Sequence, residues 1–212
     1  MSQSYTLTRG GLIRTSERAA TGAKKTAKAT TDETLLGLIA MQDQAAMRLL
    51  YARHNVRVFR FVLRLVGNEA TAEEVVTEVF LDVWRNAARF EGRAQVGTWI
   101  LGIARFKALS ARRRRTLGEI DDDALEAIED TADTPEAVCA TTERSAILKD
   151  CLKQLSQAHR EVVDLIYYHE QTIDEVARII GIPENTVKTR VFHARKKIAE
   201  LLAARGLDRL HL

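Results

Sequence analysis

The residues with the clearest binding chemistry lie near the C-terminus, in the stretch IPENTVKTRVFHARKKI at 182–198. Apolar residues recur there at steps of three and four and predict a helix. The expected inner face is Val187, Val191, Ala194, Ile198 and Leu201. The outward set consists of amides, hydroxyls and cations, which can bind base edges and phosphates in the major groove of DNA. Its members are Asn185, Thr186, Lys188, Thr189, Arg190, His193, Lys196 and Lys197.

A shorter helix is expected directly before this one, because Thr172 can cap a helix with Glu175 as its capping-box partner. Gly181 permits a left-handed turn, and Pro183 suits the first turn of the following helix. Two helices joined in this way form a helix-turn-helix, whose second helix enters the major groove. A helical hairpin with a solvated cationic face would have the same composition, and it is the alternative at this point.

Further helices are predicted in the N-terminal half. A helical hairpin should open at Thr31 or Asp32 and end at Gly67-Asn68, with Val56 among its apolar positions. The next helix should begin at Thr71, with Glu74 as its capping-box partner. Its expected apolar stripe is Val75, Val76, Val79, Phe80, Val83 and Trp84. A last helix is expected over 98–115, with a cationic end that also suits the negative end of a helix dipole.

Composition indicates an all-α fold of two small helical domains. Only 2 Pro and 11 Gly occur among 212 residues, which leaves few turns for a β-rich fold. Charge is segregated along the chain: the segment 116–140 has nine acidic residues and no Lys or Arg, whereas the blocks on either side are mildly basic. We therefore expect a disordered basic tail over 1–31, domains over 32–115 and 141–212, and an acidic flexible linker over 116–140.

Several classes of protein and site are disfavoured by the sequence. No apolar run is long enough to cross a membrane, so we expect a soluble, cytoplasmic protein without membrane insertion. Cys139 and Cys151 have no metal-ligand spacing and are interpreted as free thiols. No GxGxxG, Walker, HExxH or GxSxG pattern appears, and the five histidines lie apart. The prediction is therefore no enzyme, no metal and no cofactor.

Three motifs together resemble the extracytoplasmic-function (ECF) sigma factors, the two-domain sigma factors of bacterial RNA polymerase. AEEVVTEVFLDVWR at 72–85 is similar to the helix that binds core polymerase, and TWILGIAR at 98–105 is similar to the promoter-melting segment. The stretch at 182–198 is similar to the helix that recognises the −35 element. The resemblance implies a region 2-like domain over 32–115, a region 4-like domain over 141–212, and the β′ and β subunits of core polymerase and promoter DNA as partners.

The resemblance also implies roles for single residues. The outer face of the 72–85 helix would dock on the β′ coiled coil through Glu74, Thr77, Glu78 and Leu81. The loop at 90–97 and the helix after it would bind and open the −10 element, with a pocket for an extruded base and cations for the separated strands. The residues expected there are Arg93, Gln95, Arg105, Lys107, Arg112 and Arg113.

Two positions depart from the family pattern. Phe106 stands where the family often has Asn, and His193 stands where the recognition helix usually has Arg. A free histidine is largely neutral at pH 7.5, so His193 predicts a weaker, pH-sensitive contact.

The resemblance also implies a regulatory partner, because members of the family are commonly held inactive by an anti-sigma factor. It further implies that the acidic linker could mimic RNA inside the polymerase. The main alternative is a dimeric helix-turn-helix regulator that binds an operator, with residues 32–115 as a dimerisation or sensing domain.

Overall fold

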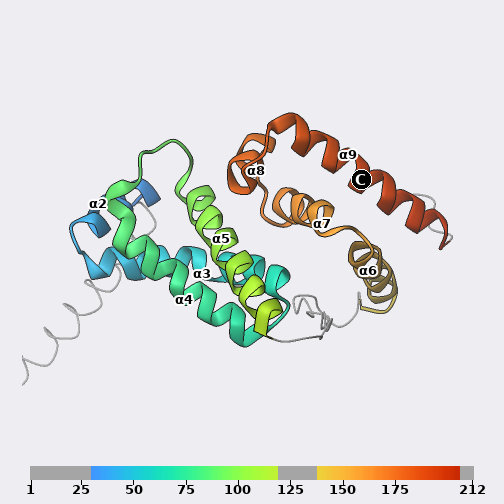
Figure 1. Cartoon of the computed structure of the whole chain (residues 1–212), viewed down its shortest axis with the longest axis horizontal. Helices are drawn as coiled ribbons and strands as arrows, with labels where there is room; N and C mark the ends of the chain where they lie inside the picture. Colours follow the sequence, from blue (N-terminus) through green and yellow to red (C-terminus); the bar gives the residue numbers. More distant parts are fainter. Residues whose placement is uncertain (1–29, 119–137, 206–212) are drawn as a thin grey trace, which may run out of the picture.

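The structure is a computed structural model that describes residues 30–118 and 138–205. The basic tail predicted at 1–31, apart from its last two residues, and most of the acidic linker predicted at 116–140 lie outside these ranges. Regular secondary structure in the described ranges is entirely helical, which confirms the all-α prediction. Figure 1 shows two groups of helices, which we call the N-terminal unit (α2 to α5) and the C-terminal unit (α6 to α9).

The helices follow in simple order. The N-terminal unit consists of α2 (Asp32–Ala40), α3 (Gln44–Val66), α4 (Glu69–Asn86), the 3-10 turn η1 (Ala87–Arg89) and α5 (Val96–Gly118). The C-terminal unit consists of α6 (Val138–Lys153), α7 (Gln157–Val163), the π-helical segment η2 (Asp164–Tyr168), α8 (Ile173–Ile180) and α9 (Glu184–Ala203).

The core of the N-terminal unit is built mainly from α3, α4 and α5, which pack against one another in all three pairs. The apolar stripe predicted on α4 is buried from Val75 to Val83, and Trp84 packs against it partly buried. The prediction of Val56 as an inner residue of α3 is wrong, because its side chain is 56% exposed. The inner face of α3 passes through Leu50, His54, Val58 and Phe61 instead, at steps of four, four and three.

The N-cap of α4 lies three residues earlier than the sequence suggests. The helix begins at Glu69, and Asn68 is the N-cap, with its side chain accepting from the backbone N–H of Thr71. Thr71 is therefore not the N-cap. Its hydroxyl donates to the same Asn68 oxygen at 3.1 Å. Asn is at least as good an N-cap as Thr, which explains why the helix can begin directly after Asn68.

The C-terminal unit contains the predicted helix-turn-helix in α8 and α9. Thr172 and Glu175 form the expected capping box, and Gly181 ends α8 in the left-handed region with φ 76°. Pro183 is the N-cap of α9 rather than a residue of its first turn, since its ψ of 146° is extended. Val187, Val191, Ala194 and Ile198 are buried as predicted, whereas Leu202, and not Leu201, completes the buried face.

The two units share one continuous core. Val162, Leu165, Val176 and Ile179 of the C-terminal unit belong to the same buried cluster as the N-terminal helices. Helix α5 contacts α8 directly, and Figure 1 shows these two helices facing each other. A second, smaller cluster around Cys151 joins α6, α7 and α9. Among the described helices, none has the length and apolarity needed to span a membrane.

Candidate functional site

The outward face of α9 presents the residues predicted to read DNA. Asn185, Lys188, Thr189, His193 and Lys196 are exposed, and Thr186 and Arg190 are half-buried. Lys188 lies 3.8 Å from Glu184 one turn earlier, and the Thr189 hydroxyl donates to the Asn185 carbonyl at 2.9 Å. These contacts are local to the helix. The face therefore remains open for a groove, and most of its polar groups, from Asn185 to His193, lie in the N-terminal half of the helix.

His193 lies on this face beside two other rings. It is stacked on His159 of α7 with ring centroids 6.4 Å apart, and it meets the exposed Phe192 edge-on at 5.4 Å. The imidazole is exposed and can reach a ligand. The described residues contain no group of three or more His, Cys, Asp or Glu arranged to hold a metal ion.

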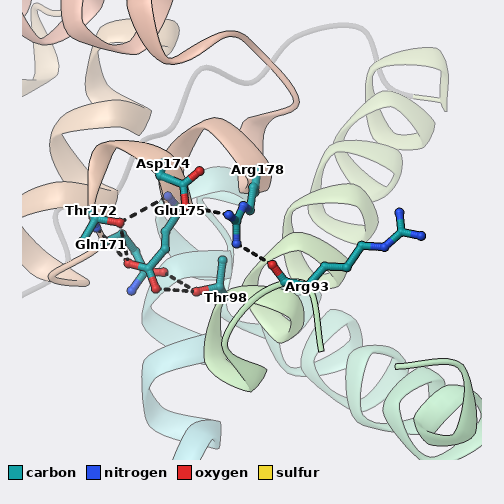
Figure 2. A network of polar contacts seen from close by, with 7 residues as sticks. All are labelled: Arg93, Thr98, Gln171, Thr172, Asp174, Glu175 and Arg178. Atoms are coloured by element: carbon teal, nitrogen blue, oxygen red, sulfur yellow. Dashed lines mark hydrogen bonds and ion pairs between the residues drawn. The ribbon is translucent and has the colours of Figure 1, made fainter. Parts of the chain in front are cut away.

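Helix α8 contacts the N-terminal unit through hydrogen bonds to the residues of its capping box. The Thr98 hydroxyl of α5 lies 3.0 Å from both the Gln171 and the Glu175 side-chain oxygens (Figure 2). Burial raises the pKa of Glu175, but hydrogen bonds from Thr172 and Thr98 and the charge of Arg57 outweigh it, so the pKa lies below its usual 4.5. The same carboxylate thus caps α8 and fixes α8 against α5.

The face predicted to bind polymerase lies on α4. Glu74, Thr77 and Leu81 are exposed, and Leu81 is 46% exposed although it is apolar. Glu78 is half-buried because α5 reaches it: Lys107 lies 3.5 Å and Arg114 3.9 Å from its carboxylate. The four residues share one side of the helix, at steps of three, one and three, as the sequence predicts.

The six residues predicted to bind the −10 element do not all face one way. Arg93 and Gln95 are exposed in the loop, and Arg113 is exposed on α5. Lys107 turns toward α4, 2.9 Å from Asp82. The hydrogen bond to Asp82 raises the pKa of Lys107 against a smaller effect of burial. Arg105 and Arg112 turn toward the C-terminal unit.

An open pocket of about 550 Å³ lies beside the loop, between the end of α4, α5 and α8. Its walls include three aromatic residues, of which Phe106 is 70% exposed. Phe90 and Trp99 meet at a centroid distance of 5.3 Å. The lining residues are Asp82, Arg89, Phe90, Glu91, Arg93, Ala94, Thr98, Trp99, Gly102, Ile103, Phe106, Arg178 and Ile179. The aromatic walls can stack on a planar nucleotide base, and the arginines among the lining residues can bind the negatively charged phosphate attached to it.

Two arginines of α3 also reach the C-terminal unit, and the sequence patterns did not single them out. Arg57 donates to the carbonyl oxygen of His169, and Arg64 forms an ion pair with Asp164. Burial lowers the pKa of Arg57, although the charges of Glu175 and Glu170 oppose this effect. The available signal was spacing, because Arg57 and Arg64 are two turns apart on one side of a helix.

Comparison with known proteins matches both units to families. The model of Sigma-70 region 2 matches residues 50–117, and that of Sigma-70, region 4 matches residues 145–198. The chain is 33% identical over 175 residues to ECF RNA polymerase sigma factor SigL of Mycobacterium tuberculosis, covering 80% of this chain and 96% of the relative. It is 27% identical over 173 residues to SigK of Mycobacterium bovis, covering 80% and 92%.

Two solved structures have the same fold. CnrH in complex with the cytosolic domain of CnrY matches with a TM-score of 0.60 and 22% identity, covering 82% of this chain and 97% of that one. The sigma factor RpoE in complex with the anti-sigma factor NepR from Bartonella quintana matches with a TM-score of 0.58 and 22% identity, covering 75% and 96%.

A region 2 unit followed by a region 4 unit defines a transcription-initiation factor of the sigma type. The identity to SigL over nearly its whole length makes the assignment more specific: the chain belongs to the ECF RNA polymerase sigma factors, which direct RNA polymerase to promoters.

Proposed function

We propose that this chain binds core RNA polymerase, recognises a −35 element through α9 and a −10 element through the N-terminal unit, and assists DNA melting. The observation that supports the proposal best is the exposed polar face of α9 on a helix-turn-helix with the expected capping box and left-handed glycine. The chemistry of RNA synthesis would belong to the polymerase, and this chain would position it.

Reading of the −35 element is assigned to α9. Asn185 and Lys188 can reach adenine and guanine edges from the first turns, where a recognition helix contacts bases. Thr189, His193 and Lys196 follow on the same side and can hold the phosphates on either side of the groove. Arg190, half-buried, marks the edge of this surface.

Binding of the −10 element is assigned to the pocket and its rim. The pocket offers Phe90, Trp99 and Phe106 for stacking on an unpaired base. Stacking on aromatic side chains is worth about 1–3 kcal/mol per base, which offsets part of the cost of unpairing. Phe106 gives this chain an aromatic surface where an amide would read a base edge, so we expect less base discrimination at that position.

Polymerase binding is assigned to Glu74, Thr77, Glu78 and Leu81 of α4. An exposed leucine surrounded by carboxylates suits a partner helix with an apolar strip and basic flanks. In this arrangement Lys107 and Arg114 orient Glu78, because they hold its carboxylate from the neighbouring helix.

A regulatory partner is the second part of the proposal. The structural relatives CnrH and RpoE are each described in complex with a partner protein, which for RpoE is the anti-sigma factor NepR. We infer that an anti-sigma factor also binds this chain. Its identity would be found by isolating the tagged chain from its host and identifying the bound protein.

The rival function is a dimeric operator-binding regulator, and DNA binding distinguishes the two. Genomic fragments would be incubated with the chain alone, with core polymerase alone and with both. A sigma factor gives sequence-specific complexes that require both proteins. Specific binding by the chain alone, with no change when polymerase is added, would support the regulator instead.

A further inference from the structure

The pocket beside the 90–97 loop is lined along one side by helix α5. Trp99, Gly102, Ile103 and Phe106 contribute to this wall, and their spacing of three, one and three residues places them on one side of the helix. Gly102 thus lies about one turn from an aromatic residue in either direction. Beyond the surrounding helix backbone, no atom lies within 4 Å of the place that a β-carbon at Gly102 would take. The wall therefore has a gap between the two aromatic residues.

Neither the backbone nor the packing of the described residues explains a glycine at position 102. Gly102 lies inside α5, where glycine is less favourable than alanine because it loses more conformational freedom on folding. Its φ is not in the left-handed region, so any residue could adopt its backbone conformation. The missing side chain leaves open space in the pocket, directly against the helix. A flat ligand could lie there in contact with the helix backbone.

The aromatic residues of the pocket indicate the shape of such a ligand. Phe90 and Trp99 meet at a centroid distance of 5.3 Å, and Phe106 is 70% exposed, so much of its ring is free to contact a ligand. A planar ring that lies against Gly102 could stack on Trp99 or Phe106. The pocket volume of about 550 Å³ falls within the range of about 300–1,000 Å³ that is usual for small-molecule sites. A small molecule with an aromatic ring system therefore fits.

The charged residues of the pocket indicate the charge of the ligand. Those that line it are Asp82, Arg89, Glu91, Arg93 and Arg178. Asp82 lies 2.9 Å from Lys107, and Glu91 lies 2.5 Å from Arg93. Arg178 lies 2.8 Å from Asp174. Arg89 is exposed and forms no ion pair with another residue of the described ranges. One positive charge thus remains unmatched, which suits a ligand with a single phosphate group better than a polyphosphate.

The rim of the pocket favours a single nucleotide over a strand. Arg178 and Arg93 both line the pocket, and a nitrogen of Arg178 lies 2.5 Å from the Arg93 carbonyl (Figure 2). This hydrogen bond closes that part of the rim. A base within a strand needs room for the chain on both sides of it, whereas a free nucleotide needs only one opening.

We propose that this pocket of the free chain is a binding site for a nucleoside monophosphate. The base lies against Gly102 between Trp99 and Phe106, and the phosphate binds Arg89 at the edge of the pocket. This ligand is a second one for the pocket, and its binding does not depend on the assignment of the −10 element. Because both ligands would use the same aromatic residues, the nucleotide and a −10 base would exclude each other.

The first test measures binding through the fluorescence of Trp99. The chain has 2 tryptophans, and W84F leaves Trp99 as the reporter. AMP, GMP, CMP and UMP would each be titrated, and calorimetry on the unsubstituted chain would give an independent affinity. We expect at least one of them to quench Trp99 in a saturable manner, with a Kd below about 1 mM. The matching nucleoside and inorganic phosphate should each bind more weakly. No saturable binding of any of the four would overturn the proposal.

Substitution of Gly102 tests where the nucleotide binds. G102A should weaken binding and G102L should weaken it at least about tenfold, because each fills the gap between the aromatic residues. The control is G37L, at an exposed and equally uncrowded glycine of α2 that does not line the pocket. Circular dichroism would check that helical content is unchanged. Unchanged affinity in a folded G102L, or an equal loss in G37L, would contradict the proposal.

Two further variants test the aromatic and the charged contact. F106A removes a stacking surface and should weaken binding about tenfold, whereas F192A removes a ring of similar exposure from α9 and should have no effect. R89Q should also weaken binding about tenfold, and R85Q, at an exposed position of α4 that does not line the pocket, is its control. Equal losses in a variant and its control would count against that contact.

A single-stranded DNA of mixed sequence distinguishes a free nucleotide from a base within a strand. The bound mononucleotide should be displaced from Trp99 by its unlabelled competitors in proportion to their own affinities. Quenching of Trp99 by the DNA but by none of the mononucleotides would restrict the pocket to strands and overturn the proposal. None of these readouts uses polymerase or a promoter, so nucleotide binding can fail while promoter-directed transcription remains intact.

Discussion

Glu175 has two structural roles, because one carboxylate closes the capping box of α8 and accepts from Thr98 of the other unit. Its pKa lies below the usual 4.5 despite the raising effect of burial, so the charged form is favoured in the folded chain. A group of this kind stabilises the fold fully above its unfolded pKa and loses that contribution as the pH falls through the folded pKa.

The substitution E175Q tests this role. At neutral pH it should lower the free energy of unfolding by about 1–2 kcal/mol, the usual cost of a lost cap or charged hydrogen bond. The difference from the unsubstituted chain should shrink as the pH falls below the usual 4.5 and through the lowered pKa of Glu175, because the carboxyl group then becomes protonated and loses its charge. Urea unfolding across this range measures it. E33Q, at an exposed position in the first turn of α2, is the control, and an equal loss there would contradict the dual role of Glu175.

We predict that His193 of α9 contributes to the strength of DNA binding. H193R would add a permanent positive charge at an exposed position on the outward face of α9, the face predicted to read DNA (the reading face). The slope of log binding constant against log salt concentration should become steeper by about 1 for the polymerase complex on its promoter. A199R adds the same charge further along α9, outside the reading face. A slope that is unchanged by H193R, or equally changed by both variants, would remove His193 from the interface.

At the scale of elements, the turn between α8 and α9 depends on Gly181. Its φ of 76° is strained for any other residue, although no atom lies within 4 Å of the place that an added β-carbon would take. G181A should therefore destabilise the chain by about 1 kcal/mol through backbone conformation alone. G37A, inside α2 and equally uncrowded, should instead stabilise it by about 0.5–1 kcal/mol. Thermal unfolding of both variants measures these changes in stability. A G181A variant as stable as the unsubstituted chain would contradict the proposed dependence of the turn on Gly181.

Helix α4 offers an exposed apolar residue with a matched control on α3. L81A should weaken the binding of core polymerase about tenfold, or about 1.4 kcal/mol, because the proposed contact centres on Leu81 and truncation costs most at the centre of an interface. V56A on α3 removes an apolar side chain of similar exposure from outside that face and should leave the affinity unchanged. Titration of labelled chain with polymerase measures both. Equal effects of the two substitutions would mean that α4 is not the binding face.

Much of the secondary structure is predictable from the sequence. The helix periods, the capping box at Thr172 and the left-handed Gly181 are local signals, and the structure confirms them. The structure differs from the prediction at the start of α4, where Asn68 and not Thr71 is the N-cap. It also differs at Val56, an apolar residue on an otherwise polar face of α3. The π-helical segment at Asp164–Tyr168 has no such local signal.

At the scale of the whole molecule, the sequence could not predict how the units meet. Arg105 and Glu161 are 56 residues apart, and Arg57 lies 112 residues from the carbonyl it binds. Helical periodicity shows which side of a helix is polar but not which partner faces it. The polar contacts of α5 with α7 and α8 are therefore visible only in the folded chain. Two arginines that were predicted to bind DNA, Arg105 and Arg112, form contacts between the units instead.

Run-off transcription tests the central claim most directly. Core polymerase from the same host would be combined with the purified chain and with genomic fragments. We expect transcripts that start at a few defined positions, require the chain, and share sequence elements near −10 and −35. We also expect K188A/R190A on α9 to reduce these transcripts strongly while binding of core polymerase persists. Polymerase that gives no chain-dependent start site on any fragment, although it binds the chain, would contradict the proposed function.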